Sequence, residues 1–137
     1  MSSASASPNE KPLLGSSKLV AFAATRDPAR SKAFYRDTLG LRFVSEDSFA
    51  IVFDANGVML RVSTVRELAQ AQYTVLGWEV SDIVGKVQEL LKAGVKFERY
   101  SFLPDQDELG VWTAPGGTRV AWFKDPDGNI LSISQHS

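Results

Sequence analysis

The 137-residue sequence contains no cysteine and only one histidine, His136. The absence of cysteine excludes disulfide bonds, thiolate nucleophiles and metal sites with sulfur ligands. A single histidine near the C-terminus also excludes the imidazole-rich sites that Zn²⁺, Ni²⁺ and Fe²⁺ prefer. Among the common metal sites, composition leaves open only an oxygen-ligated site for Mg²⁺ or Mn²⁺.

A large excess of one charge is also missing. The chain has fifteen lysines and arginines and sixteen aspartates and glutamates. It therefore lacks the excess of positive charge that would favour binding of nucleic acid. No apolar run approaches the roughly 18 residues that would span a membrane. We therefore expect a soluble protein that engages neither nucleic acid nor membranes.

The first residues, MSSASASPNEKP, are mostly small and polar and lack the apolar core of a signal peptide. We expect a disordered arm over residues 1–16 and a cytoplasmic location. The remaining residues, 17–137, are long enough for one hydrophobic core but not for two. They are therefore predicted to form a single domain.

What the sequence does contain is an internal repeat. Twice, a short apolar strand leads to an aspartate that can cap a helix, a helix that ends at glycine, and strands closed by a glycine-containing turn. The helix-ending residues Gly40 and Gly94 lie 54 positions apart, and the turn residues Gly57 and Gly128 lie 71 apart. The pattern predicts a tandem duplication of a βαβββ module.

The difference between these spacings, 71 minus 54, predicts a 17-residue insertion in the second copy, at residues 101–117. The first module then spans about residues 18–64 and the second about residues 73–135. Loops carried on a rigid scaffold often line binding sites. Trp112, in this insertion, is therefore expected either to cover a site as a lid or to contact a partner chain.

Two stretches, RDPARSKAFYRDTLGLRF (26–43) and VAWFKDPDGNILSISQ (120–135), resemble the vicinal oxygen chelate superfamily. This superfamily includes glyoxalase I, extradiol dioxygenases and bleomycin-resistance proteins. The resemblance covers residues 18–135 and implies a glyoxalase-like α+β fold. In that fold, tandem βαβββ modules form a U-shaped mixed sheet around a concave cup. Family members commonly pair, so a homodimer is expected.

Enzymes of this family hold a divalent metal in the cup, with ligands from the first and last strands of each module. The resemblance places the four ligand positions at Val20, Arg61, Val75 and Ser132. Valine has no lone pair, arginine has no acceptor, and a single serine hydroxyl is a poor ligand. We therefore expect neither a metal nor another cofactor.

Alternation of side chains along the strands predicts which residues face the cup. Trp78 and Trp122 should face the helices. If the turn in FKDPDGN has four residues, Arg119 and Phe123 face the cup. The resulting candidate ligand-binding residues, with Trp112 added from the insertion, are Phe22, Met59, Arg61, Trp112, Arg119, Phe123 and Ser132.

Arg61 is the most informative candidate, because a guanidinium among apolar side chains is costly unless an anion pairs with it. One candidate anion is Glu79 of the other module. Another is a carboxylate, phosphate or enolate of a bound molecule. In a third alternative, Arg61 reaches solvent.

These features favour metal-free binding of an anionic or aromatic small molecule in the cup, similar to bleomycin-resistance-type binders. A first alternative is a glyoxalase-like lyase or isomerase, with Glu79 as the catalytic base and Arg61 stabilising an enolate. A second alternative is a dimeric scaffold without a small ligand.

Overall fold

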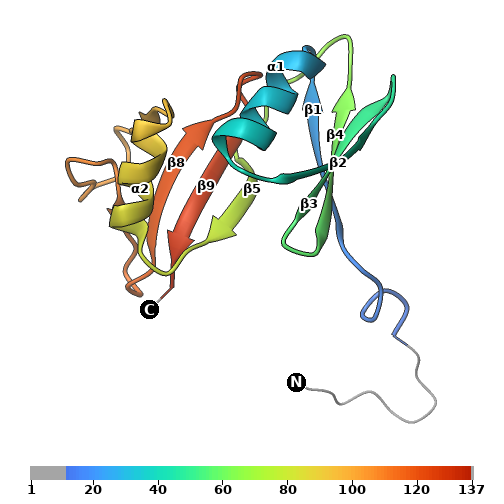
Figure 1. Cartoon of the computed structure of the whole chain (residues 1–137). Helices are drawn as coiled ribbons and strands as arrows, with labels where there is room; N and C mark the ends of the chain where they lie inside the picture. The colour runs from blue at the N-terminus through green and yellow to red at the C-terminus, as the bar shows by residue number, and fades with distance from the viewer. Residues whose placement is uncertain (1–11, 137) are drawn as a thin grey trace.

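The computed structural model describes residues 12–136 and contains two consecutive modules (Figure 1). Most of the predicted N-terminal arm, residues 1–11, lies outside the described residues. The first module comprises strand β1 (Val20–Thr25), helix α1 (Pro28–Ala33), the π-helical turn η1 (Phe34–Thr38), and strands β2 (Arg42–Glu46), β3 (Ala50–Ala55) and β4 (Val58–Thr64).

The second module repeats this order and adds one short strand from the insertion. It comprises β5 (Thr74–Glu79), α2 (Ile83–Lys92), β6 (Phe97–Glu98), β7 (Trp112–Thr113), β8 (Arg119–Lys124) and β9 (Ile130–Gln135). The strands form two mixed sheets, ordered β1-β4-β3-β2 and β5-β9-β8-β6, with β7 paired to β8. We call these sheet A and sheet B. The predicted tandem βαβββ architecture is confirmed.

The helices begin and end where the sequence predicts. The Asp27 side chain accepts a hydrogen bond from the Arg30 backbone N–H at the start of α1, and Pro28 occupies the first turn. Asp82 accepts from the Gly85 N–H at the start of α2. After the helices, Gly40 and Gly94 adopt positive φ angles of 77° and 96°, which only glycine adopts without strain.

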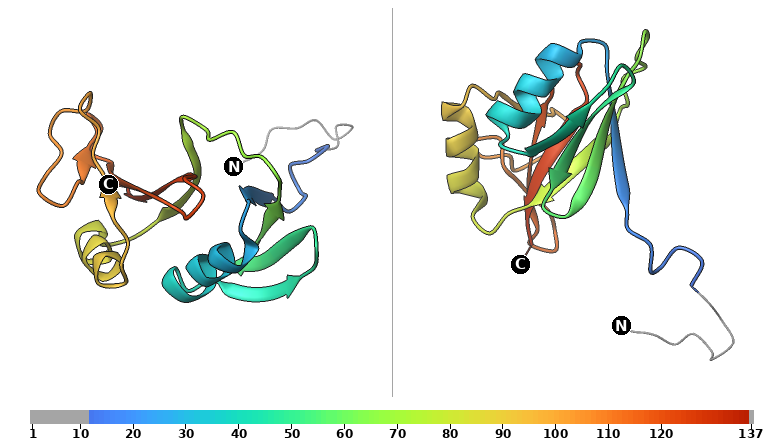
Figure 2. Two further views of the ribbon diagram at one scale, coloured as in Figure 1. Left: turned by 90° about the horizontal axis from the view of Figure 1, so that it is seen from above. Right: turned by 45° about the vertical axis from the view of Figure 1, so that its right-hand side comes forward.

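The helix-covered faces of the two sheets pack toward one another. A single cluster of buried side chains includes Phe53 and Leu60 from sheet A with Phe123 and Leu131 from sheet B. Viewed from above, both helices lie in the angle between the sheets (Figure 2). The opposite, uncovered faces, which we call open face A and open face B, therefore point away from each other. One chain alone does not enclose a cup between its modules.

Polar contacts across the module boundary fix this arrangement. Tyr35 Oη donates to Asp125 Oδ2 and Thr25 Oγ1 donates to Asp127 Oδ2, each at 2.6 Å. The Asn129 amide donates to the Ala24 carbonyl at 2.9 Å. Asp125 and Asp127 therefore do more than shape a turn, because they join the β8–β9 hairpin to the first module. No helix in the described chain is long and apolar enough to cross a membrane.

Candidate functional site

Open face A presents Arg61 within an apolar surface. In β4, Leu60 and Val62 are buried while Met59 is exposed, as the alternation along this strand predicts. Phe22 of β1 is the strand partner of Arg61 and is 58% exposed. The half-buried Arg61 is therefore bordered on its own face by exposed hydrophobic side chains.

The guanidinium of Arg61 has no hydrogen bond or ion pair with any other described residue. It does act on Asp47 through space. The pKa of Asp47 is lowered, first by the backbone N–H groups of Phe49 and Ala50 and to a smaller extent by the positive charge of Arg61. Within the described chain, Arg61 therefore forms no ion pair, and Asp47 is an anion on which its charge acts at longer range.

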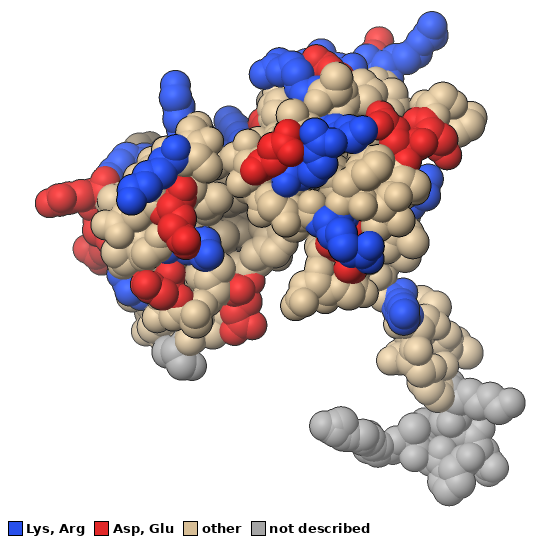
Figure 3. All heavy atoms as spheres, in the orientation of Figure 1, with Lys and Arg blue, Asp and Glu red and all other residues tan. Residues whose placement is uncertain are grey.

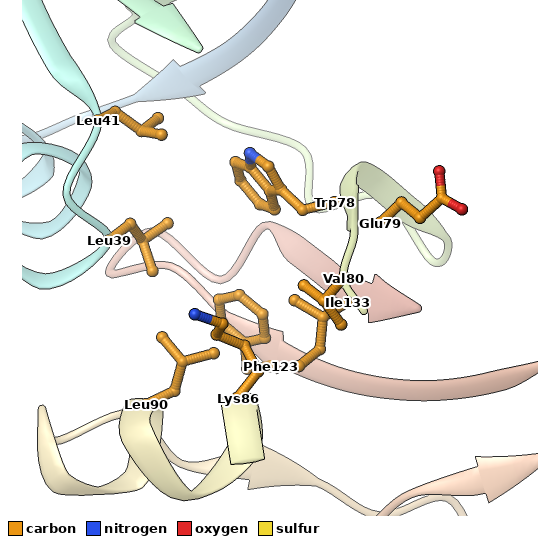
Figure 4. A pocket seen from close by; sticks show the side chains of 9 residues that line it. All are labelled: Leu39, Leu41, Trp78, Glu79, Val80, Lys86, Leu90, Phe123 and Ile133. Carbon is orange, nitrogen blue, oxygen red and sulfur yellow. The ribbon is translucent and has the colours of Figure 1, made fainter. Parts of the chain in front are cut away.

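The Arg61–Glu79 ion pair, one of the alternatives from the sequence, is not formed within the described chain. Glu79 is exposed at the end of β5, in sheet B, opposite Ser134 of β9. Its carboxylate points away from a cavity between the two modules that Trp78 and Phe123 help to line (Figure 4). The two residues belong to sheets whose open faces point in different directions, which separates the expected pair.

Open face B carries an aromatic cluster that the sequence only partly predicts. The Trp122 ring centroid lies 6.0 Å from that of Trp112 and 5.6 Å from that of Tyr100. Phe102 stacks at a tilt on Tyr100, with centroids 5.5 Å apart. Trp122 Nε1 donates to Thr74 Oγ1 at 3.1 Å. These side chains line a concavity of about 370 Å³.

The insertion is folded onto open face B by its own hydrogen bonds. The Arg99 guanidinium donates to the Asp107 carbonyl at 2.7 Å and to the Glu108 carbonyl. One Asp107 carboxylate oxygen accepts the backbone N–H groups of Leu109 and Val111, each at 2.9 Å. These bonds hold the loop that delivers Trp112 to the aromatic cluster.

Tyr100 contributes an unpaired polar atom to this cluster. Its hydroxyl oxygen is buried and has no hydrogen-bond partner among the described residues. Burial, with a smaller contribution from Glu98, raises the pKa of Tyr100. A buried hydroxyl without a partner is unfavourable, so the aromatic cluster contains one unused hydrogen-bond donor.

The predicted positions of Arg119, Phe123 and Trp122 were wrong. Lys124 pairs with Ile130, so five residues, 125–129, form the turn instead of four. Asp125 stabilises this longer turn by accepting the backbone N–H groups of Asp127 and Asn129. Because of the extra residue, each β8 side chain lies on the opposite face of sheet B from the one predicted.

After this inversion, Phe123 is 1% exposed in the core. Arg119, four residues before Phe123 in β8, lies on the same side of the sheet and pairs with Gln135. Trp122 lies beside Ser132 on open face B. Ser132 therefore keeps its predicted facing, whereas Tyr100, Phe102 and Trp122 were missed. The length of the DPDGN turn was the signal that could have located Trp122.

The residues at the family's metal positions do not fit a metal. Val20 and Arg61 lie on open face A, and Ser132 lies on open face B beside Gly77. Together with Val75 they supply one hydroxyl and no carboxylate or imidazole. The part of the chain that the structure describes contains no group of three or more His, Cys, Asp or Glu side chains placed to bind a metal.

Over the helix-covered side, basic and acidic side chains are interspersed (Figure 3). This side shows no broad patch of one sign, in contrast to the isolated positive charge of Arg61 on open face A. The surface charge of the helix-covered side therefore does not favour an extended polyanion.

Comparison with known proteins places the chain in a family. Residues 19–133 match the family model described as "Glyoxalase/Bleomycin resistance protein/Dioxygenase superfamily". Among curated proteins, none matches.

Solved structures with similar folds come from several bacteria. A glyoxalase/bleomycin resistance protein/dioxygenase from Alicyclobacillus acidocaldarius shares 16% identity over 88% of this chain and 92% of its own, with a TM-score of 0.67. A lactoylglutathione lyase from Agrobacterium tumefaciens shares 18% identity over 87% and 93%, with a TM-score of 0.64. A genomically encoded fosfomycin resistance protein from Listeria monocytogenes shares 13% identity over 87% and 92%, with a TM-score of 0.67. At these identities the similarity establishes the fold alone.

Proposed function

This chain belongs to the glyoxalase/bleomycin resistance protein/dioxygenase superfamily, and from that premise we propose that it binds a flat, anionic small molecule without a metal. The binding site is a cup assembled from two copies of the chain. Open face A of one copy supplies Arg61, and open face B of the other supplies the aromatic cluster. The resemblance to bleomycin-resistance-type binders favours sequestration of this ligand over its conversion.

The observation that carries the proposal is the unpaired guanidinium of Arg61 in an apolar surface. Phe22 and Met59, beside it, are 58% and 45% exposed. A large exposed hydrophobic surface typically marks an interaction site. A guanidinium there, with no ion pair in the described chain, is suited to a carboxylate or phosphate, which it can bind through two parallel hydrogen bonds.

Assembly from two copies follows from the directions of the open faces. Within one chain these faces point apart, so a single ligand cannot contact both Arg61 and Trp112 of the same copy. A two-fold symmetric dimer that joins face A to face B of the other copy forms two equivalent cups at once. The ligand would then stack on the aromatic rings while its anionic group pairs with Arg61.

The absence of a metal is supported by the chemistry of the side chains. The four positions that carry ligands in metal-dependent relatives hold Val20, Arg61, Val75 and Ser132. Arg61 would also repel a divalent cation placed beside it. In this proposal Arg61 takes the place of the metal, because it attracts the oxygens of the ligand directly.

The test is a thermal-shift and calorimetric screen of aromatic carboxylates and phosphates in the presence of EDTA. Ligands that raise the melting temperature of the native state are expected with EDTA present. Arg61→Met should weaken them by roughly 10- to 100-fold, about 1.5–3 kcal/mol for a charged hydrogen bond.

Arg36→Met is the matched control, because Arg36 is exposed and pairs only with its neighbour Asp37; it should leave binding unchanged. Hits that require added metal, or that bind Arg61→Met as tightly as the natural chain, would overturn the proposal. Turnover of a hit that is lost in Glu79→Gln would instead support the lyase or isomerase alternative. If the screen finds no ligand of any class, the proposed function is refuted and the scaffold alternative stands.

A further inference from the structure

A second cavity lies on the helix-covered side, between the modules and away from both open faces (Figure 4). Its volume is about 210 Å³. Leu39 and Leu41 line it from the first module, and Trp78, Leu90 and Ile133 are among the residues that line it from the second. Because its wall is formed by hydrophobic side chains, water gains few hydrogen bonds inside it.

Lys86 of α2 is the cation at this cavity. The other charged residue in its lining is Glu79, whose carboxylate points away from it (Figure 4). The Lys86 ammonium lies 2.9 Å from Glu89 Oε1, and these two side chains are 45% and 69% exposed. A pair this exposed is weak, and an ammonium has three donors. Lys86 can therefore bind a second anion at the cavity.

We propose that this cavity is a second ligand site, for a short straight-chain monocarboxylate. The hydrocarbon chain fills the apolar space between the modules, and the carboxylate pairs with Lys86. An apolar cavity of about 150 Å³ is sufficient for benzene, so the larger volume here accommodates a chain of about six carbons. The site differs from the cup in position and in ligand, because the cup takes a flat molecule on Arg61 and the aromatic cluster.

The neighbouring glutamate gives this site a specific signature. Glu89 shares the ammonium of Lys86 and repels an incoming carboxylate. Removing its charge with Glu89→Gln should therefore tighten carboxylate binding by a few fold. Removing the ammonium with Lys86→Met should weaken hexanoate by about two- to fivefold, as expected for an exposed ion pair, while leaving 1-hexanol unaffected. Each methylene removed from the acid should weaken binding by about fourfold.

The three tryptophans report separately on the two sites. Trp78 lines the inter-module cavity, whereas Trp112 and Trp122 lie on open face B. Titration of the full-length, ¹⁵N-labelled chain with hexanoate should shift the indole N–H resonance of Trp78 and leave those of Trp112 and Trp122 in place. Lys92→Met, at the end of the same helix, is the control that should change nothing, and Arg61→Met should also leave the titration unchanged.

The inference is overturned if millimolar hexanoate shifts none of the indole resonances, or shifts those of Trp112 and Trp122 and not that of Trp78. It is equally overturned if Lys86→Met binds hexanoate as the natural chain does. Because Arg61→Met disables the proposed cup and not this cavity, failure of one site is distinguishable from failure of the other.

Discussion

Two tyrosine hydroxyls in this protein are shielded from solvent but differ in their partners. Tyr35 Oη donates to the carboxylate of Asp125 at 2.6 Å, whereas Tyr100 Oη has no partner among the described residues. The same substitution at both positions therefore separates a hydroxyl that holds a hydrogen bond from one that makes none within the described chain.

Tyr35→Phe should lower the free energy of unfolding by about 1.5–3 kcal/mol, because it removes a hydrogen bond to a charged group and leaves Asp125 with one donor fewer. Tyr100→Phe should change stability by less than about 1 kcal/mol, since no bond is lost. Denaturant unfolding measures both effects, and a Tyr100→Phe variant destabilised as much as Tyr35→Phe would contradict this assignment.

The ionisation of Tyr35 also gives stability a pH dependence. Burial first, and then the nearby charge of Asp125 and the hydrogen bond to it, raise the pKa of Tyr35 far above its ordinary value of 10.0. The native state therefore keeps a proton that the unfolded state loses above about pH 10, and the stability gained from this residue falls as pH rises further.

Melting temperatures measured from pH 8 to pH 11 should accordingly fall more steeply above pH 10 for the natural chain than for Tyr35→Phe. Tyr73→Phe, at an exposed tyrosine, is the control and should retain the steep fall. Parallel curves for the natural chain and Tyr35→Phe would show that Tyr35 is not the group responsible.

At the level of elements, the insertion depends on Arg99 for its fold, because this side chain donates to the carbonyls of two successive residues, Asp107 and Glu108. Both bonds come from one guanidinium nitrogen, Nη2, so the test variant has to remove the donors altogether. Arg99→Met should therefore weaken the Trp112–Trp122 contact at a cost of about 1 kcal/mol in stability. The expected readout is a smaller near-ultraviolet circular dichroism signal and weaker binding of cup ligands. Arg42→Met, at an exposed ion pair with Asp54, should retain both the signal and the binding, and an unchanged spectrum for Arg99→Met would contradict this role.

The elements that the sequence predicts well are those specified by local chemistry. Asp27 and Asp82 cap helices through side chains that reach only three residues ahead, and Asn56-Gly57 forms a two-residue hairpin turn with positive φ angles. The β8–β9 turn was mispredicted because its length depends on hydrogen bonds to Asp125. A change of one residue in a turn inverts the facing of one flanking strand relative to the other, which here is β8 relative to β9. As a result, the sequence predicts Phe123 in the site, whereas the structure places Trp122 there.

At the scale of the whole molecule, the direction of each open face is set by contacts between residues about 100 positions apart, such as Thr25 with Asp127. Strand periodicity indicates which residues share a face, but it carries no information on how two modules turn toward one another. The duplication was therefore predictable, whereas the outward direction of the open faces was not. The same contacts explain why Arg61 and Glu79 are not paired within the described chain.

The central claim, that one cup takes Arg61 from one copy and Trp112 from another, is tested most directly by mixing two defective variants. Arg61→Met and Trp112→Ala should each bind an identified cup ligand weakly as separate homodimers. In a mixed dimer, the intact Arg61 of one copy meets the intact Trp112 of the other, so one of the two cups is whole.

After unfolding and joint refolding at equal concentrations, calorimetry should detect tight sites in about a quarter of the subunits, because about half of the dimers are mixed and each carries one intact cup. Mass spectrometry of the refolded sample verifies that mixed dimers have formed. The cup is not built from two copies if mixed dimers are present and no tight sites return. The same conclusion follows if light scattering finds only 15.0 kDa monomers that bind the ligand tightly.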